Sequence, residues 1–193
     1  MKMLNKEYWE NRYLNKDTGW DTGHITTPLK NYIDQLNNND LKLLIPGVGN
    51  GYEFDYLIKH KFKNTTVIDI SSQPIINLRF KHPEYEDQII LGDFFEHKEK
   101  YDCIIEQTFF CALDPNLRTA YCNKIHNLLN KNGKVVGLLF NFELTEVGPP
   151  FGGNIVEYTK LFYEKFSINV LERCYNSIKP RDGRELFFIF EKN

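Results

Sequence analysis

The sequence lacks the long apolar runs, blocks of like charge and leader pattern that mark membrane or nucleic-acid-binding proteins. No apolar run approaches the ~20 residues of a membrane-spanning helix, and the polar residues 1–10 lack the apolar centre of a signal peptide. The formal net charge is -2 and the basic residues are scattered, so we expect no nucleic-acid partner. The sequence predicts a cytoplasmic protein, monomer or weak dimer, with a small-molecule substrate.

Cysteine is also scarce, and its placement suggests no metal site. The chain has 4 cysteines and 5 histidines. No two cysteines form a Cys-x-x-Cys pair, and none lies near a histidine at the spacing of metal ligands. Neither a Ser-His-Asp pattern nor paired carboxylates with a clear role stand out. We expect reduced, mostly buried thiols and no metal. The cysteines are Cys103, Cys111, Cys122 and Cys174.

What the chain does contain is an alternation of short apolar strands and helices over 193 residues. This alternation predicts a single α/β domain, a mostly parallel sheet with helices on both faces. The short loop with Pro180 and Gly183 suits an antiparallel last pair of strands. We expect a helical lid and lead-in over 1–40 and an α/β core over 41–193. The expected strands are 41–45, 65–70, 88–91, 101–105, 134–140, 167–175 and 184–191, and the expected helices include 6–14, 27–36, 73–80, 114–130 and 157–166.

A glycine-rich turn follows the first expected strand. Residues 46–51 read Pro-Gly-Val-Gly-Asn-Gly and precede a helix. Glycines let the backbone turn tightly and approach a ligand closely where a strand ends and a helix begins. Compared with the dinucleotide pattern Gly-x-Gly-x-x-Gly, the third glycine comes one residue early and Tyr52 follows it. The turn predicts cofactor contacts from Gly47, Gly49 and Gly51 and disfavours a pyrophosphate cofactor.

Acidic residues follow the next two strands. Asp69 ends the second strand, about twenty residues after the glycines, where a carboxylate accepts hydrogen bonds from the hydroxyls of a ribose. Asp93 follows the third strand and is placed to accept from an adenine amino group, with Phe94 packing against the ring. Signals after three consecutive strands predict an adenosine-containing cofactor without a pyrophosphate.

These residues, with others along the chain, resemble the thiopurine methyltransferase family, and most closely its halide and thiol methyltransferase branch. The resemblance runs from Trp9 to about Arg184, and the early aromatic pattern of the family appears as Trp9, Tyr13 and Trp20. The further matching segments are Gly-Trp-Asp-Thr-Gly at 19–23, Ile-Pro-Gly-Val-Gly at 45–49, Phe-Phe-Cys-Ala-Leu at 109–113 and Gly-Pro-Pro-Phe at 148–151.

The resemblance implies a Rossmann-like class I methyltransferase fold, with one antiparallel terminal strand in a seven-stranded sheet. It implies S-adenosylmethionine as cofactor, S-adenosylhomocysteine as product, and substrate-lining positions for Phe110 and Phe151. Tyr13 stands where this branch often has tryptophan and Gln107 where relatives have tyrosine or arginine, which leaves the acceptor open. The implied cofactor contacts are Trp9, Tyr13, Trp20, Gly47, Asp69, Asp93, Phe94 and Gln107.

Such a reaction needs few catalytic groups. The methyl group of a sulfonium moves by in-line displacement, so the site supplies mainly alignment and exclusion of water. Aromatic faces attract the cation by roughly 0.5–2 kcal/mol each, and Trp9, Tyr13 and Trp20 are the candidates for this role. The alternative is that these three residues only pack the N-terminal helix against the core. A thiol with a pKa near ~8.5 is partly thiolate at neutral pH, and a halide needs no base.

Asp21 and His24 are the candidates for a proton relay, or else a helix cap and a surface residue. Arg118 and Arg181 are placed to assist an anion, but we expect both to be solvated. We expect Glu106, at the end of the fourth strand, to line the site. A thiol or sulfide is the first choice of acceptor, a halide the second and a thiopurine the third.

Two other functions stay open at this point. One is a nucleotide-cofactor oxidoreductase on a similar fold, which the early third glycine and the second acid disfavour. The other is a non-catalytic cofactor-binding module, which the lack of an obvious base permits.

Overall fold

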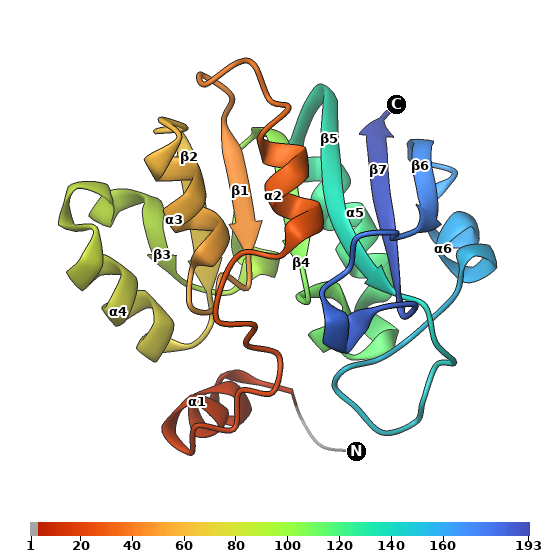
Figure 1. Cartoon of the computed structure of the whole chain (residues 1–193), viewed down its shortest axis with the longest axis horizontal. Helices are drawn as coiled ribbons and strands as arrows, with labels where there is room; N and C mark the ends of the chain where they lie inside the picture. The colour runs from red at the N-terminus through yellow and green to blue at the C-terminus, as the bar shows by residue number, and fades with distance from the viewer. Residues whose placement is uncertain (1–3) are drawn as a thin grey trace.

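Seven strands form one sheet in the order β3-β2-β1-β4-β5-β7-β6 (Figure 1). A computed structural model describes residues 4–193, so residues 1–3 of the expected lead-in lie outside the described residues. β1 and β2 are buried at every position, as expected for parallel strands covered on both faces. The strands are β1 Leu43–Pro46, β2 Thr65–Asp69, β3 Ile89–Leu91, β4 Tyr101–Gln107, β5 Leu129–Phe140, β6 Phe166–Arg173 and β7 Glu185–Lys192.

The predicted sheet is confirmed, and the structure shows where its reversed strand lies. β7 is the last strand in sequence, yet it lies between β5 and β6 and is antiparallel to both. Phe140 at the end of β5 pairs with Glu185 at the start of β7. The segment that leads into β7 therefore reaches the same edge of the sheet as the carboxyl ends of the parallel strands.

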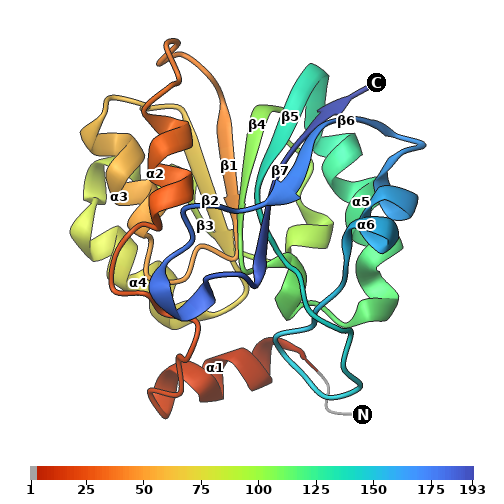
Figure 2. The same ribbon diagram turned by 45° about the vertical axis from the view of Figure 1, so that its right-hand side comes forward.

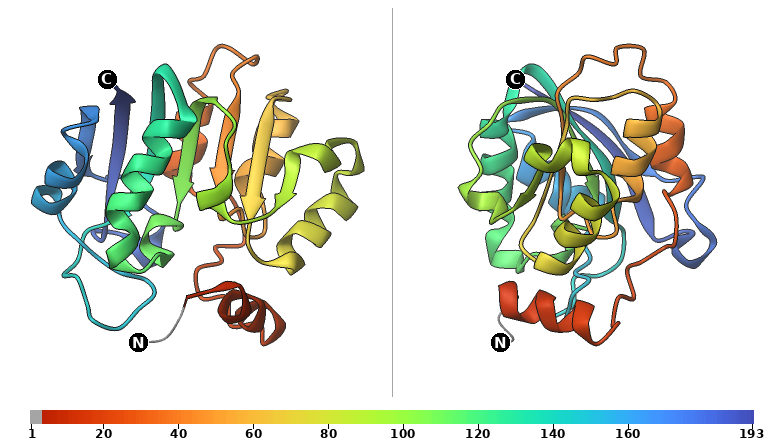
Figure 3. Two further views of the ribbon diagram at one scale, coloured as in Figure 1. Left: turned by 180° about the vertical axis from the view of Figure 1, so that it is seen from behind. Right: turned by 90° about the vertical axis from the view of Figure 1, so that its left-hand side faces the viewer.

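Helices cover both faces of the sheet (Figure 3). Leu29, Phe54 and Leu78 of α2, α3 and α4 belong to one buried cluster, and Ile125 and Phe162 of α5 and α6 belong to the other. The remaining helix, α1, lies below the carboxyl edge and has no buried residue (Figures 1 and 2). The helices are α1 Lys6–Leu14, α2 Thr27–Ile33, α3 Tyr52–Lys59, α4 Ser72–Lys81, α5 Arg118–Leu128 and α6 Ile155–Phe162.

Several element boundaries differ from the prediction by a few residues, and two of these differences have an identifiable cause. The helix expected over 114–130 ends at Leu128, because Leu129 already pairs with Tyr101 and begins β5. The helix expected over 157–166 begins earlier, since the Asn154 side chain accepts the Glu157 backbone N–H and caps α6. Pairing with a distant strand sets the first boundary, which periodicity alone does not reveal. A local cap sets the second, and an asparagine is a residue type that favours this position.

The four cysteines are buried and unpaired. Within residues 4–193 no helix has the length and apolar character needed to cross a bilayer.

Candidate active site

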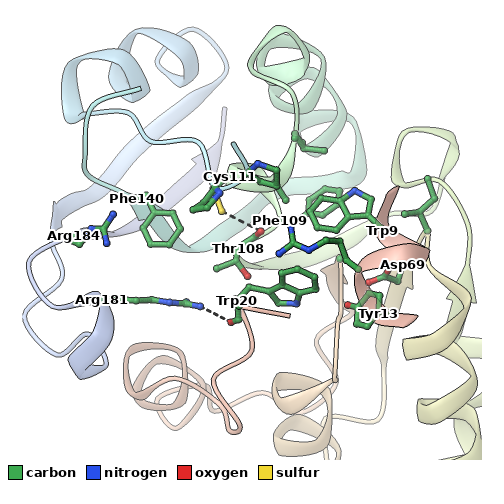
Figure 4. A pocket seen from close by; sticks show the side chains of 18 of the residues that line it. Trp9, Tyr13, Trp20, Asp69, Thr108, Phe109, Cys111, Phe140, Arg181 and Arg184 are labelled. Atoms are coloured by element: carbon green, nitrogen blue, oxygen red, sulfur yellow. Dashed lines mark hydrogen bonds between the residues drawn. The ribbon is translucent and has the colours of Figure 1, made fainter. Parts of the chain in front are cut away.

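A cavity of about 390 Å³ opens at the carboxyl edge of the sheet, between α1 and the loops after β1, β2, β4 and β5 (Figure 4). Asp69, Tyr13 and Trp9 lie at one end, and Arg181, Arg184 and Phe140 lie at the other. The cavity is lined by Trp9, Arg12, Tyr13, Gly19, Trp20, Gly47, Asp69, Ile70, Thr108, Phe109, Cys111, Ala112, Leu113, Phe140, Phe142, Pro149, Pro150, Pro180, Arg181 and Arg184.

The Asp69 end of the cavity is built on the glycine turn. Gly47 and Gly49 have φ of 61° and 54°, which glycine adopts without the strain of a side chain. Asp69 accepts hydrogen bonds from Gly49 N at 3.2 Å and Ser71 N at 2.8 Å. Burial raises the pKa of Asp69 to about 6, against those hydrogen bonds. Its carboxylate is thus held at the cavity wall beside bare backbone.

Three aromatic rings close this end. Trp20 meets Trp9 edge to face at a centroid distance of 5.5 Å and Tyr13 at 5.6 Å. Tyr13 lies over the glycine turn, since a Cβ on Gly49 would be 3.5 Å from its hydroxyl oxygen. The Arg12 guanidinium stands 5.0 Å from the Trp20 ring. The predicted aromatic residues therefore form one cluster, drawn from α1 and the loop after it.

Polar contacts hold α1 and that loop in place. The Glu10 carboxylate accepts from Ser72 N at 2.8 Å, Ser72 Oγ at 3.0 Å and Ser71 Oγ at 3.3 Å. It thereby satisfies a free N–H at the start of α4. Further along, Asp21 accepts from Asn50 Nδ2 at 2.6 Å and from the Tyr52 hydroxyl at 2.8 Å. The lid is tied to the start of α4 and the start of α3.

A smaller cavity of about 40 Å³ adjoins the first and shares Trp20, Gly47, Thr108 and Arg181 with it. Gln107 lines it and accepts from Thr26 Oγ1 through Oε1 at 3.0 Å. Gln107 Nε2 is buried and has no hydrogen-bond partner among the described residues.

Glu53, which also lines the smaller cavity, is buried, and burial raises its pKa to about 7. The unpaired Nε2 of Gln107 and the buried carboxyl group of Glu53 thus belong to residues that line the smaller cavity.

The opposite end of the larger cavity is apolar with two guanidinium groups. Arg181 is 9% exposed, donates to Trp20 O at 2.8 Å and lies 3.4 Å from Glu185. Arg184 lies over the Phe142 ring at 4.7 Å. The expectation that Arg181 is solvated is wrong, because the reversed strand β7 brings its loop onto the cavity. Among the described residues, no histidine or glutamate lines the larger cavity.

The sequence-predicted residues divide into three groups. Trp9, Tyr13, Trp20, Gly47 and Asp69 line the larger cavity, and Gly49, Gln107 and Asp21 line the smaller one. The residues that line neither are Gly51, Asp93, Phe94, Phe110, Phe151 and His24.

Packing explains most of that third group. A Cβ on Gly51 would lie 2.4 Å from Leu78, so Gly51 faces α4. Phe94 and Phe110 are buried in the core cluster around Tyr121. Asp93 is exposed and accepts from Phe95 N at 2.8 Å.

Phe151 and His24 also stand apart from the cavities. Phe151 is buried, with 7% of its surface exposed, and packs over Gly148. His24 is exposed. Glu106 was expected to line the site, but it is fully buried behind the wall.

Several lining residues were missed from the sequence. Arg12, Phe140, Phe142 and Arg184 all face the larger cavity. A signal was present for three of them: Phe140 ends the expected strand 134–140, Phe142 follows it, and Arg184 begins the expected strand 184–191. Because a reversed strand begins where its parallel neighbours end, its first residues belong to the ligand-binding edge.

The chain is similar to known proteins in sequence and in structure. The sequence model of the thiopurine S-methyltransferase family matches residues 4–192. A probable thiol methyltransferase 2 of Arabidopsis thaliana is 27% identical over 187 residues, 92% of this chain and 81% of the relative. A thiopurine S-methyltransferase of Vibrio campbellii is 23% identical over 216 residues, 98% of this chain and 100% of the relative.

Solved structures share the fold at lower identity. The Burkholderia thailandensis 1,6-didemethyltoxoflavin-N1-methyltransferase, with bound S-adenosylhomocysteine, has a TM-score of 0.76 and 15% identity over 97% of this chain and 87% of its own. The Synechocystis magnesium protoporphyrin IX methyltransferase, with bound SAM, has a TM-score of 0.71 and 14% identity over 97% of this chain and 95% of its own. These likenesses concern the fold.

Proposed function

Since this chain belongs to the thiopurine S-methyltransferase family and is an S-adenosylmethionine-dependent methyltransferase, we propose that its acceptor is a small anionic soft nucleophile. A thiolate or hydrosulfide is the first choice, a halide or halide-like anion the second. The observation that carries this proposal is a pair of arginines on an aromatic wall, in a cavity whose described lining contains no histidine or glutamate.

The residues at the Asp69 end fit the cofactor. S-adenosylmethionine joins a ribose and an adenine to a sulfonium-bearing amino acid. The Asp69 carboxylate offers acceptors to ribose hydroxyls beside glycines whose backbone a ligand can approach. Trp9, Tyr13 and Trp20 present aromatic rings to the same space, and such rings attract a cation. No phosphate-binding group is required.

Each proposed contact has its own chemical basis. When bound, S-adenosylmethionine supplies an electrophilic methyl group on a positively charged sulfur. We assign Asp69 to the ribose and the three aromatic rings to the cation. The adenine contact of Asp93 stays a prediction from the sequence, because Asp93 lines neither cavity. Gln107 Nε2 is buried and finds no partner within residues 4–193. It suits the cofactor carboxylate, because an unpaired buried donor costs free energy that a ligand acceptor recovers.

The arginine end suits an acceptor that arrives already charged. Arg184 stands over Phe142, and Arg181 over Phe140 at 5.8 Å. Guanidinium groups attract an anion. That attraction is strongest at Arg181, which is buried, because it is less screened by water than at the exposed Arg184. A thiolate needs no general base. Asp21 is occupied by Asn50 and Tyr52 and His24 lines neither cavity, so we assign proton transfer to neither.

An acceptor screen tests the proposal. Release of S-adenosylhomocysteine is followed with hydrosulfide, thiocyanate, iodide, 6-mercaptopurine and an uncharged amine of similar size. We expect turnover with the sulfur anions and none with the amine. Turnover confined to the amine, or equal across all acceptors, contradicts the proposal.

Arg184→Gln makes the screen specific to the arginine end. We expect KM for hydrosulfide to rise about five- to tenfold through loss of one charge partner, with the affinity for S-adenosylhomocysteine unchanged. Lys179→Gln is the matched control, because Lys179 is an exposed cation of the same loop and lines neither cavity. An equal rise of KM for hydrosulfide in both variants would be a general effect of removing positive charge. That result would contradict the role of Arg184.

Cytoplasmic location and a monomer or weak dimer remain predictions from the sequence. Light scattering on purified protein across a concentration series measures the second.

A further inference from the structure

A fully buried carboxylate lies directly behind the cavity wall. Glu106 in β4 is 0% exposed. Its Oε1 accepts from Phe109 N at 2.8 Å and Phe110 N at 2.9 Å, and its Oε2 accepts from the Tyr121 hydroxyl of α5 at 2.8 Å. A carboxylate is a pure acceptor and matches three converging donors. Burial raises the pKa of Glu106 to about 7 against these hydrogen bonds.

The two backbone hydrogen bonds fix the turn that follows β4. A single oxygen receives two successive N–H groups, which holds residues 108–110 in one tight conformation. Thr108 adopts a φ of 59°, rare for a non-glycine residue, and its carbonyl accepts from Cys111 Sγ at 3.4 Å. This turn carries Thr108, Phe109 and Cys111 to the cavity surface, where Figure 4 shows them between the two ends.

A second part of the wall depends on the same turn. Phe151 N donates to Cys111 O at 2.8 Å. Arg118, whose guanidinium lies over Phe110 at 4.9 Å, donates to Gly152 O at 2.6 Å. The proline segment 149–150, which lines the same cavity, is thus attached to the turn held by Glu106.

The neighbouring strand leaves room for this arrangement. A Cβ on Gly137 in β5 would lie 2.1 Å from Glu106 O and 2.7 Å from Glu106 Cβ. Glycine in a strand interior often marks a close approach of another backbone. The close approach here keeps Glu106 in place at the end of its strand.

We propose that Glu106 is a positioning residue that shapes the acceptor end of the cavity through the turn at 108–113. The proposal rests on the proposed function for the identity of that end. Glu106 makes its side-chain hydrogen bonds to Phe109, Phe110 and Tyr121 rather than to Asp69 or Glu10. Its turn nevertheless meets the glycine turn, since a Cβ on Gly47 would lie 2.4 Å from the Phe109 ring. We therefore expect a larger effect on the acceptor and a smaller one on the cofactor. Misplacement of a positioning wall by about 1 Å is enough to cost up to ~100-fold in rate.

The test compares Glu106→Gln, Glu106→Ala and Tyr121→Phe in the full chain. Glutamine accepts both N–H groups through its oxygen and donates to the Tyr121 oxygen, so it retains part of the geometry. We expect kcat/KM for hydrosulfide to fall about tenfold in Glu106→Gln and further in Glu106→Ala. The dissociation constant of S-adenosylhomocysteine, measured by calorimetry, should stay within about threefold of wild type.

Leu128→Ala is the matched control for lost stability. Leu128 is buried in α5, the helix that carries Tyr121, but it makes no hydrogen bond to the turn. At a comparable drop in melting temperature, its kcat/KM should stay near the wild-type value. Equal losses of kcat/KM in Leu128→Ala, or an equal weakening of S-adenosylhomocysteine binding in Glu106→Gln, overturn the proposal.

Hydrogen exchange separates this proposal from the proposed function. Residues 108–113 should exchange faster in Glu106→Gln and Tyr121→Phe than in wild type, and by a larger factor than the glycine turn 46–51, which Phe109 contacts at Gly47. If wild type methylates none of the acceptors, the proposed function fails and exchange alone decides on Glu106. In that case, unchanged exchange at residues 108–113 overturns the positioning role of Glu106. If Glu106→Ala does not fold, Glu106→Gln and Tyr121→Phe carry the test.

Discussion

Buried carboxylates hold backbone N–H groups at two neighbouring points of the carboxyl edge. The Asp69 carboxylate accepts hydrogen bonds from Gly49 N and Ser71 N. The Glu106 carboxylate accepts from Phe109 N and Phe110 N. Both groups have raised pKa values because burial penalises their charge. They differ in access, since Asp69 lines the cavity and Glu106 does not. The first is therefore placed to bind a ligand and the second to shape the wall.

Asp69→Asn should weaken S-adenosylhomocysteine binding about tenfold or more. An amide loses the charge that strengthens hydrogen bonds from ribose hydroxyls and turns a donor toward one of its partners. Calorimetry on the purified variant measures the dissociation constant.

Asp102→Asn is the control for this prediction. Its carboxylate also holds a backbone N–H, that of Lys42 at 2.9 Å, but near the start of β4. We expect its affinity to match wild type. Equal losses in both variants would mean that Asp69 acts only through stability.

Helix α1 is attached by polar contacts, because it buries no residue of its own. Glu10→Ala removes its carboxylate from Ser71 and Ser72 at the start of α4. We expect affinity for S-adenosylhomocysteine to fall about fivefold as the aromatic lid loosens, because loss of a helix cap costs ~1 kcal/mol. Calorimetry gives the affinity, and limited proteolysis should show faster cleavage after Arg12 and Lys16.

The lid prediction has a control on the same helix. Glu7 is an exposed acidic residue of α1, and Glu7→Ala should leave both affinity and proteolysis near wild type. A Glu10→Ala protein with wild-type affinity would show that the Glu10 contact does not hold the lid.

The pairing of β4 with β5 depends on one glycine. Gly137→Ala places a methyl group against the Glu106 backbone, 2.1 Å from its carbonyl oxygen before any shift. Overpacking of this kind should cost about 3 kcal/mol, which lowers the melting temperature by roughly 10 °C in a chain of this size. Gly19→Ala should melt near wild type, because the added Cβ has no atom of the described part of the chain within 4 Å, its neighbours in sequence apart. A wild-type melting temperature for Gly137→Ala would contradict the close approach.

The whole molecule should become less stable as pH rises from about 5 to 7. Burial raises the pKa of Asp69 to about 6 and the pKa values of Glu53 and Glu106 to about 7. The folded state then keeps protons that the unfolded chain has already lost, so unfolding releases protons and rising pH favours it. The lowered pKa values of His97 and His126 act in the opposite direction, but both are only partly buried.

Ligand binding should show the reverse pH dependence. Ionised Asp69 is the better acceptor for ribose hydroxyls, so affinity for S-adenosylhomocysteine should rise as pH passes through about 6. Thermal melts from pH 5 to 8 with and without S-adenosylhomocysteine measure both effects, and Glu106→Gln should flatten the fall in stability. A melting temperature that rises from pH 5 to 7 without ligand would contradict the buried carboxylates as the controlling groups.

The sequence by itself determined the order of the elements and the Asp69 end of the cavity. The glycine turn after β1 and the acid at the end of β2 are local signals, and the carboxyl ends of parallel strands meet at one edge whatever the helices do. The early aromatic residues share one face of a short helix, so Trp9 and Tyr13 were identifiable as a pair. The structure contains these predicted features because each depends on residues close in sequence.

Only the tertiary structure decided the acceptor end and the fate of several aromatic side chains. Arg181 and Arg184 reach the cavity because β7 is inserted antiparallel between β5 and β6. Phe94 and Phe151 turned out to be buried, since the side that an aromatic ring faces depends on packing between segments far apart in sequence. Glu106 was visible as an acid at a strand end, but its three donors come from a turn and a helix that meet only in the folded chain.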